Sequence, residues 1–380
     1  MIYYLYYSYV PNTASFNRAL SYFKSLDKLR INATIVFLMP DSNNSRLKER
    51  YSNIKIKYLW DNYYIPLPRL KYISYYLYTL FFINRLKEGD IVYVDGLEKI
   101  AKRILKKRGV KLYVESTECP EVYTYLNPIH ELRPKDFIQL CKKADGLFVI
   151  SSALKAYYNE KGIDEKKIHI INMTVDTDRF SSLNKTTSKI KYIAYCGTVS
   201  NNKDGVDRLI KAYSIVAKSH PEVSLYIIGS IPSKQEECGN IQLIKSMGLE
   251  DKIHLTGLVP AEQMPQLLKN AVLLALARPN NKQAKYGFPT KLGEYLMTEN
   301  PVAVTAVGDI PLFLTDGVNA LIPPACDDSA MAQKMIWAIE HPQESSVIGI
   351  RGREVAEKCF NALIETKKMV DIMTNQLFSE

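Results

Sequence analysis

The sequence of 380 residues lacks the features of disulfide-bonded, zinc-stabilised and secreted proteins. Its 6 Cys include no Cys-x-x-Cys pair and its 5 His do not stand at zinc-finger spacing, so we expect reduced thiols in a cytosolic protein and no metal site. The start, MIYYLYYSYV, has neither the basic region nor the small-residue cleavage site of a signal peptide, and predicts a buried first strand. Internal repeats and nucleic-acid-binding motifs are also missing, which argues against a nucleic-acid partner.

Apolar runs long enough to cross a membrane are absent. The most membrane-like stretch, residues 72–83 (YISYYLYTLFFI), has 12 residues, whereas a spanning helix needs about 20 apolar residues. It is flanked by Arg69, Lys71, Arg85 and Lys87. Two interpretations remain open: a helix packed against a sheet, or a helix lying at a bilayer surface with its cations on lipid phosphates.

The composition, 47% hydrophobic and 24% charged, excludes a disordered or fibrous chain, and the length predicts two domains. Positive charge is unevenly distributed: residues 1–187 hold 30 Lys and Arg against 19 Asp and Glu, whereas residues 188–380 hold 20 against 21. We therefore expect an anionic partner at the N-terminal half. The alternative is that the lysines only aid solubility.

Apolar, strand-like runs alternate with amphipathic helical stretches, which is typical of parallel α/β layers. The expected strands of the N-terminal half are 3–9, 33–38, 54–59, 91–94, 111–114, 146–150 and 168–171. Those of the C-terminal half are 192–196, 224–228, 253–256, 272–275, 302–305 and 320–322. The polar segment 181–189 is the best linker between two doubly wound domains, whose ligands would bind in a cleft at the carboxyl ends of the strands.

Loop 197–205 (GTVSNNKDG) lies between an expected strand and an expected helix. Gly197 would let backbone amides approach a phosphate, which Lys203 could neutralise. Segment 255–260 (LTGLVP) could read a flat base through its main chain. For both segments, an ordinary turn after a strand is the alternative.

Segment 286–296 (YGFPTKLGEYL) predicts a helix opened by Pro289, with the amides of Thr290, Lys291 and Leu292 directed at a diphosphate. Glu294, one turn further, could accept hydrogen bonds from the two hydroxyls of a ribose. Alternatively, Lys291 and Glu294 are solvated surface residues.

Taken together, these motifs resemble the donor-binding domain of family 4 (group 1 type) glycosyltransferases, which are retaining GT-B enzymes that use nucleotide-sugars. The resembling segments are GTVSNNKDGVDRLIKAY, LYIIGS, IHLTGLV and GFPTKLGEYLMTENPVAVTAVGDI, with PNTASFNRALSYFKSL, ADGLFVISSALKAYYNEKGI and VDTDRF in the N-terminal half. The resemblance implies an α/β fold of two Rossmann-like domains facing a central cleft. Residues 1–182 would bind the acceptor and 188–365 the donor, with a C-terminal helix at about 366–380 packing back on the first domain.

The resemblance also assigns roles to residues, with Lys203, Glu118 and Glu294 as the catalytic set. The implied donor-binding residues are Gly197, Thr198, Lys203, Gly257, Leu258, Arg278, Phe288, Pro289, Thr290, Lys291 and Glu294. Asn12, Thr13 and Ala14 would form the acceptor-side loop, near the leaving phosphate.

Three departures from the family pattern stand out. Tyr286 occupies the place of the first of two Glu residues, and Thr198 stands where a cation often follows the first Gly. Arg278, Lys282 or Lys285 could supply charge instead. The family's N-terminal-domain His is missing; Glu118 is the expected replacement, with His130 as the alternative. No chemistry is expected of His169, His220, His254 and His341.

The resemblance implies a metal-independent transfer on one face of the donor sugar, without a cofactor. The departing diphosphate would take the acceptor proton while Lys203 and helix-end amides stabilise its charge. We expect a UDP-linked donor and a glycan or lipid-diphosphate-linked acceptor in surface polysaccharide assembly, with the protein cytoplasmic and peripheral at the inner face of the cell membrane. The alternatives are a non-catalytic GT-B relative that binds nucleotide-sugar or glycan, and a nucleotide-sugar epimerase.

Overall fold

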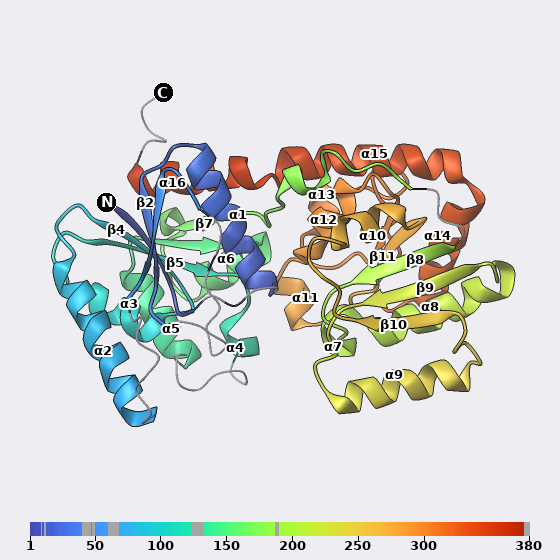
Figure 1. Ribbon diagram of the computed structural model, residues 1–380, viewed down its shortest axis with the longest axis horizontal. Helices are drawn as coiled ribbons and strands as arrows, with labels where there is room; N and C mark the ends of the chain where they lie inside the picture. The colour runs from blue at the N-terminus through green and yellow to red at the C-terminus, as the bar shows by residue number, and fades with distance from the viewer. Residues whose placement is uncertain are drawn as a thin grey trace. The chain divides into compact units, whose positions relative to one another are not determined.

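The computed structural model describes residues 1–8, 10, 13–39, 47, 50–59, 68–123, 133–186 and 190–375 (Figure 1). The chain divides into two compact units. Unit 1 holds Met1–Asn172 and the chain from Ala362 onward, and unit 2 holds Met173–Asn361. The division falls before the polar segment 181–189, because Val175 already bonds within unit 2, where its N–H donates to the Phe360 carbonyl at 2.8 Å.

The described residues of unit 1 form a seven-stranded sheet with the order β3-β2-β1-β4-β5-β6-β7, in which the pairs are parallel. The strands are β1 (Ile2–Tyr6), β2 (Ala33–Phe37), β3 (Ile54–Tyr58), β4 (Ile91–Asp95), β5 (Lys111–Ser116), β6 (Gly146–Val149) and β7 (Ile168–Ile170). Successive crossovers run in opposite directions from β1, so β1 and β4 flank the switch point of this sheet.

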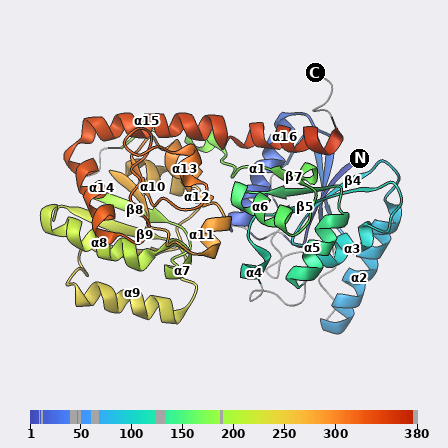
Figure 2. The ribbon, with the colours of Figure 1, turned by 180° about the vertical axis from the view of Figure 1, so that it is seen from behind.

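Helices cover the sheet of unit 1, among them one from the far end of the chain. They are α1 (Ala14–Lys28), α2 (Pro68–Arg85), α3 (Glu98–Ile104), α4 (Pro120–Tyr123), α5 (Pro134–Lys143), α6 (Ser152–Glu160) and α16 (Ala362–Thr374). In both views α16 lies beside α1 (Figures 1 and 2), and its Met369, Val370 and Met373 join the aromatic core of this unit. The C-terminal helix thus belongs to unit 1, and it begins four residues before the predicted position.

The described residues of unit 2 form a five-stranded parallel sheet with the order β10-β9-β8-β11-β12. The strands are β8 (Lys191–Cys196), β9 (Val223–Ile228), β10 (Ile253–Gly257), β11 (Leu273–Leu276) and β12 (Val302–Val304). The helices are α7 (Asn201–Asp204), α8 (Val206–Ser219), α9 (Lys234–Ser246), α10 (Met264–Asn270), α11 (Lys282–Tyr286), α12 (Lys291–Met297), α13 (Ile310–Phe313), α14 (Asp328–Glu340) and α15 (Pro342–Cys359). Fully buried runs such as the LLAL of β11 are typical of parallel strands covered on both faces.

The expected strand at 320–322 is not formed. Leu321 makes only an isolated bridge to Ala303, through bonds from its own N–H to Val302 and from the N–H of Val304 to its carbonyl, both 2.9 Å. Pro323 and Pro324 follow directly and have no N–H to donate, so the ladder cannot continue.

A buried carboxylate, Glu115 on β5, organises the interior of unit 1. Arg18 donates to its Oε1 from Nη2 at 2.9 Å, Tyr22 donates to the same oxygen at 3.0 Å, and Tyr93 donates to Oε2 at 2.6 Å. The Arg18 guanidinium also donates from Nη1 to the Asn172 carbonyl at 2.6 Å. Both charged side chains are buried, so this ion pair is part of the core.

Candidate functional site

Glycine backbones line the carboxyl ends of three neighbouring strands of unit 2. The N–H of Gly197, after β8, donates to the Ile228 carbonyl, and the N–H of Gly229, after β9, donates to the Gly257 carbonyl, both at 2.9 Å. A Cβ on Gly229, whose φ is +140°, would lie 1.9 Å from the Gly197 carbonyl oxygen. Only glycine permits this approach. Gly229 itself is buried, whereas Gly197 and Gly257 are partly exposed and present backbone that suits a flat or anionic ligand.

Asp204 is the centre of the polar cluster beneath these loops. It is 2% exposed and accepts hydrogen bonds from Tyr195 Oη at 2.8 Å and from Lys291 Nζ. The Nε of Arg278, also 2% exposed, lies 3.8 Å from its Oδ1. Burial acts to raise the pKa of the Asp204 carboxyl, but Lys291 and Arg278 outweigh it and hold that pKa below its ordinary value. Two cations thus meet at one buried carboxylate.

Lys291 reaches this cluster directly under the first loop. A Cβ on Gly197 would lie 2.1 Å from Lys291 Nζ, so glycine is needed for the ammonium to occupy this place. Lys291 Nζ also donates to Tyr195 Oη at 2.9 Å. The side chain is 15% exposed, so the open interpretation of Lys291 as a solvated surface cation does not hold.

Lys203 lies in the last turn of α7, next to Asp204. Its N–H donates to Ser200 Oγ, the cap of α7, at 3.3 Å, and its carbonyl accepts from Arg278 Nε at 3.4 Å. Gly205 has a left-handed φ of +67° and separates α7 from α8. This sharp turn holds the Lys203 backbone over Arg278.

The aromatic ring of Phe288 anchors the segment before α12. Phe288 packs against Phe313 and Phe360, with centroids 5.6 and 5.4 Å apart, so its side chain is a core contact. The Leu292 N–H donates to the Pro289 carbonyl at 3.0 Å, which removes it from the three amides expected to face a diphosphate. Pro289 precedes the helix, Thr290 is its N-cap, and Lys291 is its first residue.

Glu294 is held by Arg179, a residue that the sequence analysis did not single out. Arg179 Nη1 donates to Glu294 Oε1, and its Nη2 donates to the Ala261 carbonyl at 3.2 Å. Arg179 belongs to the turn Thr177–Phe180, within the VDTDRF motif, which is the one signal that could have drawn attention to it. Because Arg179 occupies one carboxylate oxygen, the other is left to accept from a ligand.

The remaining residues expected at the donor site lie around the carboxyl ends of the unit 2 strands, except Tyr286, which lies at the end of α11. The Thr198 carbonyl oxygen lies 2.5 Å from Tyr195 Oη, so it and Asp204 share the one proton of that hydroxyl. Gly257 has a φ of +68°, and Leu258, directly after it, is 74% exposed. Tyr286, at the end of α11, has the Lys285 ammonium 5.3 Å from its ring centroid.

In unit 1, the expected acceptor-side residues lie near the start of α1 and after β5. Thr13 caps α1 by accepting from the Phe16 N–H at 3.3 Å, and Ala14 is the first residue of the helix. Glu118 is half-buried, and its carbonyl accepts from Ser116 Oγ at 3.0 Å. Asn12 and His130 lie outside the described residues.

Asp95, at the carboxyl end of β4, is a titratable group that the sequence did not single out. Burial raises the pKa of this carboxyl to about 7, and the nearby Glu115 and Glu98 add to the effect, while Arg18 opposes it. It lies beside the switch point of the unit 1 sheet, the place where ligands of open α/β sheets bind.

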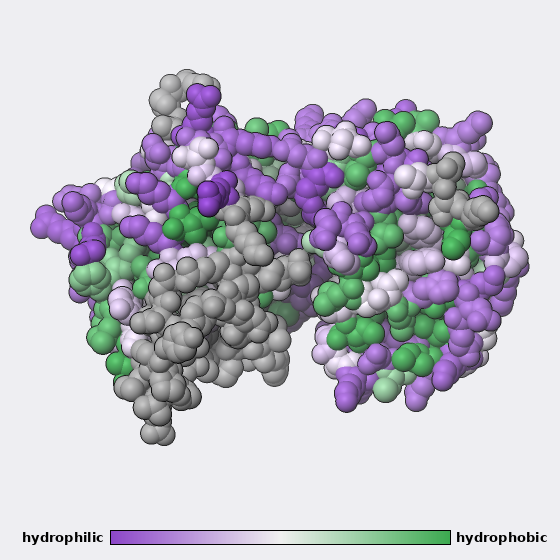
Figure 3. Space-filling model, viewed as in Figure 1, coloured by the Kyte–Doolittle hydropathy of each residue, from purple (hydrophilic) through white to green (hydrophobic). Residues whose placement is uncertain are grey.

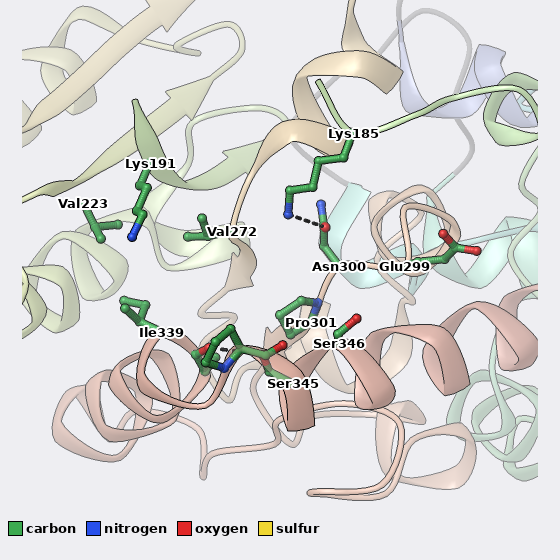
Figure 4. A pocket seen from close by; sticks show the side chains of 12 residues that line it. Lys185, Lys191, Val223, Val272, Glu299, Asn300, Pro301, Ile339, Ser345 and Ser346 are labelled. Atoms are coloured by element: carbon green, nitrogen blue, oxygen red, sulfur yellow. Dashed lines mark hydrogen bonds between the residues drawn. The ribbon is translucent and has the colours of Figure 1, made fainter. Parts of the chain in front are cut away.

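In the part of the chain that the structure describes, neither metal-ligating side chains nor a cavity indicate a second centre. Over the described ranges, no group of three or more His, Cys, Asp or Glu side chains is placed to hold a metal ion. A cavity of about 300 Å³ lies at the opposite, amino-terminal edge of the unit 2 sheet, where Lys185 donates to Asn300 Oδ1 at 3.3 Å (Figure 4). It is therefore separate from the glycine-lined edge.

Comparisons with known proteins support the resemblance. Residues 190–341, which lie in unit 2, match the family model described as Glycosyl transferases group 1, and this match confirms the resemblance to group 1 glycosyltransferases. Mannosylfructose-phosphate synthase of Agrobacterium fabrum is 25% identical over 250 residues, which are 60% of this chain and 54% of that protein. The chain thus spans about half the length of this curated relative.

Two solved structures show the fold. HepE of Anabaena has a TM-score of 0.75 at 16% identity, over 98% of this chain and 99% of that chain. Sucrose-phosphate synthase of Thermosynechococcus elongatus has a TM-score of 0.75 at 15% identity, over 100% of this chain and 99% of that chain. The expected GT-B fold, built from two parallel α/β units, is confirmed.

Proposed function

We propose that the protein is a retaining, metal-independent glycosyltransferase that moves a sugar from a UDP-sugar to a glycan or lipid-diphosphate-linked acceptor. Unit 2 would bind the donor and unit 1 the acceptor. The observation that carries the proposal is the Asp204 cluster, in which Lys291 and Arg278 meet one carboxylate and the Lys291 ammonium lies directly beneath Gly197. Cationic side chains beside glycine backbone suit a diphosphate.

In the proposed reaction, the bond between the sugar C1 and the diphosphate oxygen breaks while a bond from the acceptor oxygen to C1 forms on the same face. The acceptor proton passes to the departing diphosphate oxygen. Lys203 and the positive cluster stabilise the charge that grows on the diphosphate, which is the main contribution asked of the protein. Glu294, positioned by Arg179, would accept hydrogen bonds from the ribose hydroxyls.

A UDP carrier is supported by HepE, whose structures include complexes with UDP and with UDP-glucose. We place the acceptor in surface polysaccharide assembly because the N-terminal half carries the excess positive charge, 30 Lys and Arg against 19 Asp and Glu, which suits an acceptor bearing a diphosphate. The protein would then work as a cytoplasmic, peripheral protein at the inner face of the cell membrane.

The test is calorimetric titration of the full chain with UDP, GDP and ADP, followed by the sugar derivatives of the nucleotide that binds. We expect UDP to bind, and Lys203→Ala and Glu294→Gln to weaken it at least tenfold, on the order of 1.4 kcal/mol. Lys218→Ala, an exposed cation in the last turn of α8, is the matched control and should bind as the wild type. Absence of binding by all three nucleotides, or equal affinity in Lys203→Ala and Lys218→Ala, would refute the donor site.

Tyr286 supports a second candidate, a non-catalytic relative that binds nucleotide-sugar or glycan. Its ring, stacked by Lys285, stands where the family carries a Glu near the transferred sugar. Binding of the UDP-sugar without transfer or hydrolysis would favour this candidate. Conversion of the donor into an isomer without an acceptor would instead indicate an epimerase.

A further inference from the structure

Helix α2 of unit 1 has one face on the sheet and one face in solvent. The inner face packs on β1 and its end: the ring of Tyr75 lies 5.9 Å from that of Tyr7, and the ring of Phe82 lies 5.4 Å from that of Tyr3. These contacts fix the rotation of the helix. The side chains on the opposite side therefore point away from the core.

That outer face is apolar. Ile73, Leu77 and Phe81, spaced four residues apart along one stripe, are 54%, 58% and 54% exposed. Tyr76 and Tyr78 beside them are 44% and 50% exposed. Of the 17 exposed large hydrophobic side chains among the described residues, five thus lie on this one helix. Figure 3 shows hydrophobic side chains along the lower left edge, where α2 lies in Figure 1.

A basic segment borders this face. Residues 99–111, in and after α3, contain seven Lys and Arg and no Asp or Glu. Two contacts join the segment to α2: Arg103 lies 4.7 Å from the Tyr76 ring centroid and donates to its hydroxyl, and Lys107 Nζ donates to the Asn84 carbonyl at 3.3 Å. Arg85 of α2 itself lies 4.0 Å above the Phe81 ring. Cations therefore stand against the aromatic side chains.

We infer that the outer face of α2, together with the basic segment 99–111, binds the surface of an anionic lipid bilayer. Half-exposed Ile, Leu and Phe can enter the boundary between headgroups and acyl chains, Tyr is suited to that boundary, and the cations lie level with lipid phosphates. The free energy of apolar insertion and that of charge attraction to anionic lipids add, so neither contribution needs to be large by itself. None of the helices in the part of the chain that is described is long and apolar enough to cross a bilayer.

The inference deepens the proposed function, since it gives unit 1 a place at the membrane where a lipid-linked acceptor would be found. The inference depends on the proposed function only where it relates membrane binding to a lipid-linked acceptor. Binding to vesicles is measured without donor or acceptor, so the two can fail separately.

The experiment is co-sedimentation of the full chain with vesicles of phosphatidylcholine, with and without about 30% phosphatidylglycerol. We expect binding to the anionic vesicles that weakens as salt is added, and little binding to neutral vesicles. Leu77→Glu with Phe81→Glu should reduce the binding at least about tenfold, because two carboxylates would face the phosphates. Lys106→Ala with Arg108→Ala should reduce it by about tenfold or more and flatten the salt dependence.

The control replaces two apolar residues of similar exposure elsewhere. Val347 and Ile350 on α15 are 47% and 48% exposed, so Val347→Glu with Ile350→Glu makes the same change in unit 2 and should bind vesicles as the wild type. Titration with UDP reports whether each variant keeps a folded donor site, and an affinity equal to the wild type is expected for all of them. Absence of UDP binding in every protein would count against the proposed function and leave the vesicle result standing.

Three results would overturn the inference. The first is a wild type that ignores anionic vesicles at low salt. The second is an equal loss of binding in the α2 and α15 variants. The third is a dimer of the wild type, seen by size-exclusion chromatography, that dissociates in Leu77→Glu with Phe81→Glu while vesicle binding is unchanged, because the face would then be covered by a second copy.

Discussion

Each unit surrounds a buried carboxylate with cationic and tyrosine side chains, but the two arrangements have different consequences. In unit 1, Glu115 is matched by one guanidinium, that of Arg18, and the tyrosine hydroxyls complete its shell inside the core. In unit 2, Asp204 is shared by Lys291 and Arg278 at the edge where strands end. A balanced pair in the interior can only hold the fold. Two cations that meet at a carboxylate below partly exposed backbone can also bind an anion.

The largest expected effect would come from unbalancing the core pair. Glu115→Gln leaves Arg18 as a buried charge without a carboxylate and should lower the free energy of unfolding by about 3–5 kcal/mol. Urea denaturation measures this, with Glu118→Gln, a half-buried residue on the following loop, as the control expected to change it by less than about 0.5 kcal/mol. UDP affinity at a temperature where the variant is folded should not change. A loss of UDP affinity there would mean that the Glu115 pair is more than a core contact.

The next effect concerns turnover in unit 2. Lys203→Ala should lower the transfer rate on the order of 10²–10³-fold, because one contact to the growing charge of the leaving group is lost. Thermal unfolding should stay close to the wild type, since Lys203 is only partly buried. Transfer is followed by release of UDP. A rate near that of the wild type would remove Lys203 from the mechanism and leave Lys291 and Arg278 as the cations to examine.

A single methyl group should disturb the open site without touching its charges. Gly197→Ala places a Cβ 2.1 Å from Lys291 Nζ on a backbone with φ +153°, so Lys291 must move away from Asp204. We expect UDP affinity to fall by about tenfold, on the order of 1.4 kcal/mol, measured by calorimetry. Gly239→Ala is the matched control: its Cβ meets nothing within 4 Å, and it lies in helix α9. Equal UDP affinity in both variants would show that the position of Lys291 is unimportant.

The smallest effect tests a third carboxyl, Asp95, for which burial and the nearby Glu115 outweigh the influence of Arg18. Its folded pKa is about 7 against an ordinary value of 3.8, so the folded state keeps a proton that the unfolded chain releases. Stability should therefore fall as pH rises from about 4 to 7, and Asp95→Asn should remove this loss. At pH 8 the variant should be more stable by about 1 kcal/mol, a figure reduced because the side chain still reaches solvent, and at pH 4 the two should be alike. The measurement is thermal unfolding of the wild type and of Asp95→Asn at pH 4 and pH 8. A difference in stability that is the same at both pH values would contradict the raised pKa of Asp95.

Much of the fold could be predicted because its signals are local. Buried runs such as LLAL of β11 and the cap at Thr13 depend on a few neighbouring residues, and the alternation of strands and helices follows from them. The strand predicted at 320–322 was wrong because a hydrophobic run was weighed without the two prolines after it. A run that can donate no further N–H ends at one bridge.

The site could be predicted only as a list of residues. Lys291 and Asp204 stand 87 positions apart, and Arg179 and Glu294 stand 115 apart, so neither pair has a sequence spacing that reveals it. The pairing follows from sheet order, which brings loops of distant strands together. Helix α2 teaches a related lesson: Tyr75 and Phe82 pack on the sheet, as the first of the two open interpretations predicts, whereas Leu77 is exposed and the bilayer-surface interpretation stays a prediction.

Helix α16 has a consequence for biosynthesis. Its Met369, Val370 and Met373 complete the core around α1, and the Tyr113 hydroxyl donates to the Ile372 carbonyl at 3.4 Å. The ribosome makes these residues only after all of unit 2. Although domains generally fold in the order of their synthesis, the unit that is begun first here is closed last. Until residues 362–375 emerge, the apolar side chains of α1 that pack on α16 stay uncovered, so the nascent chain exposes a surface of the kind that chaperones bind.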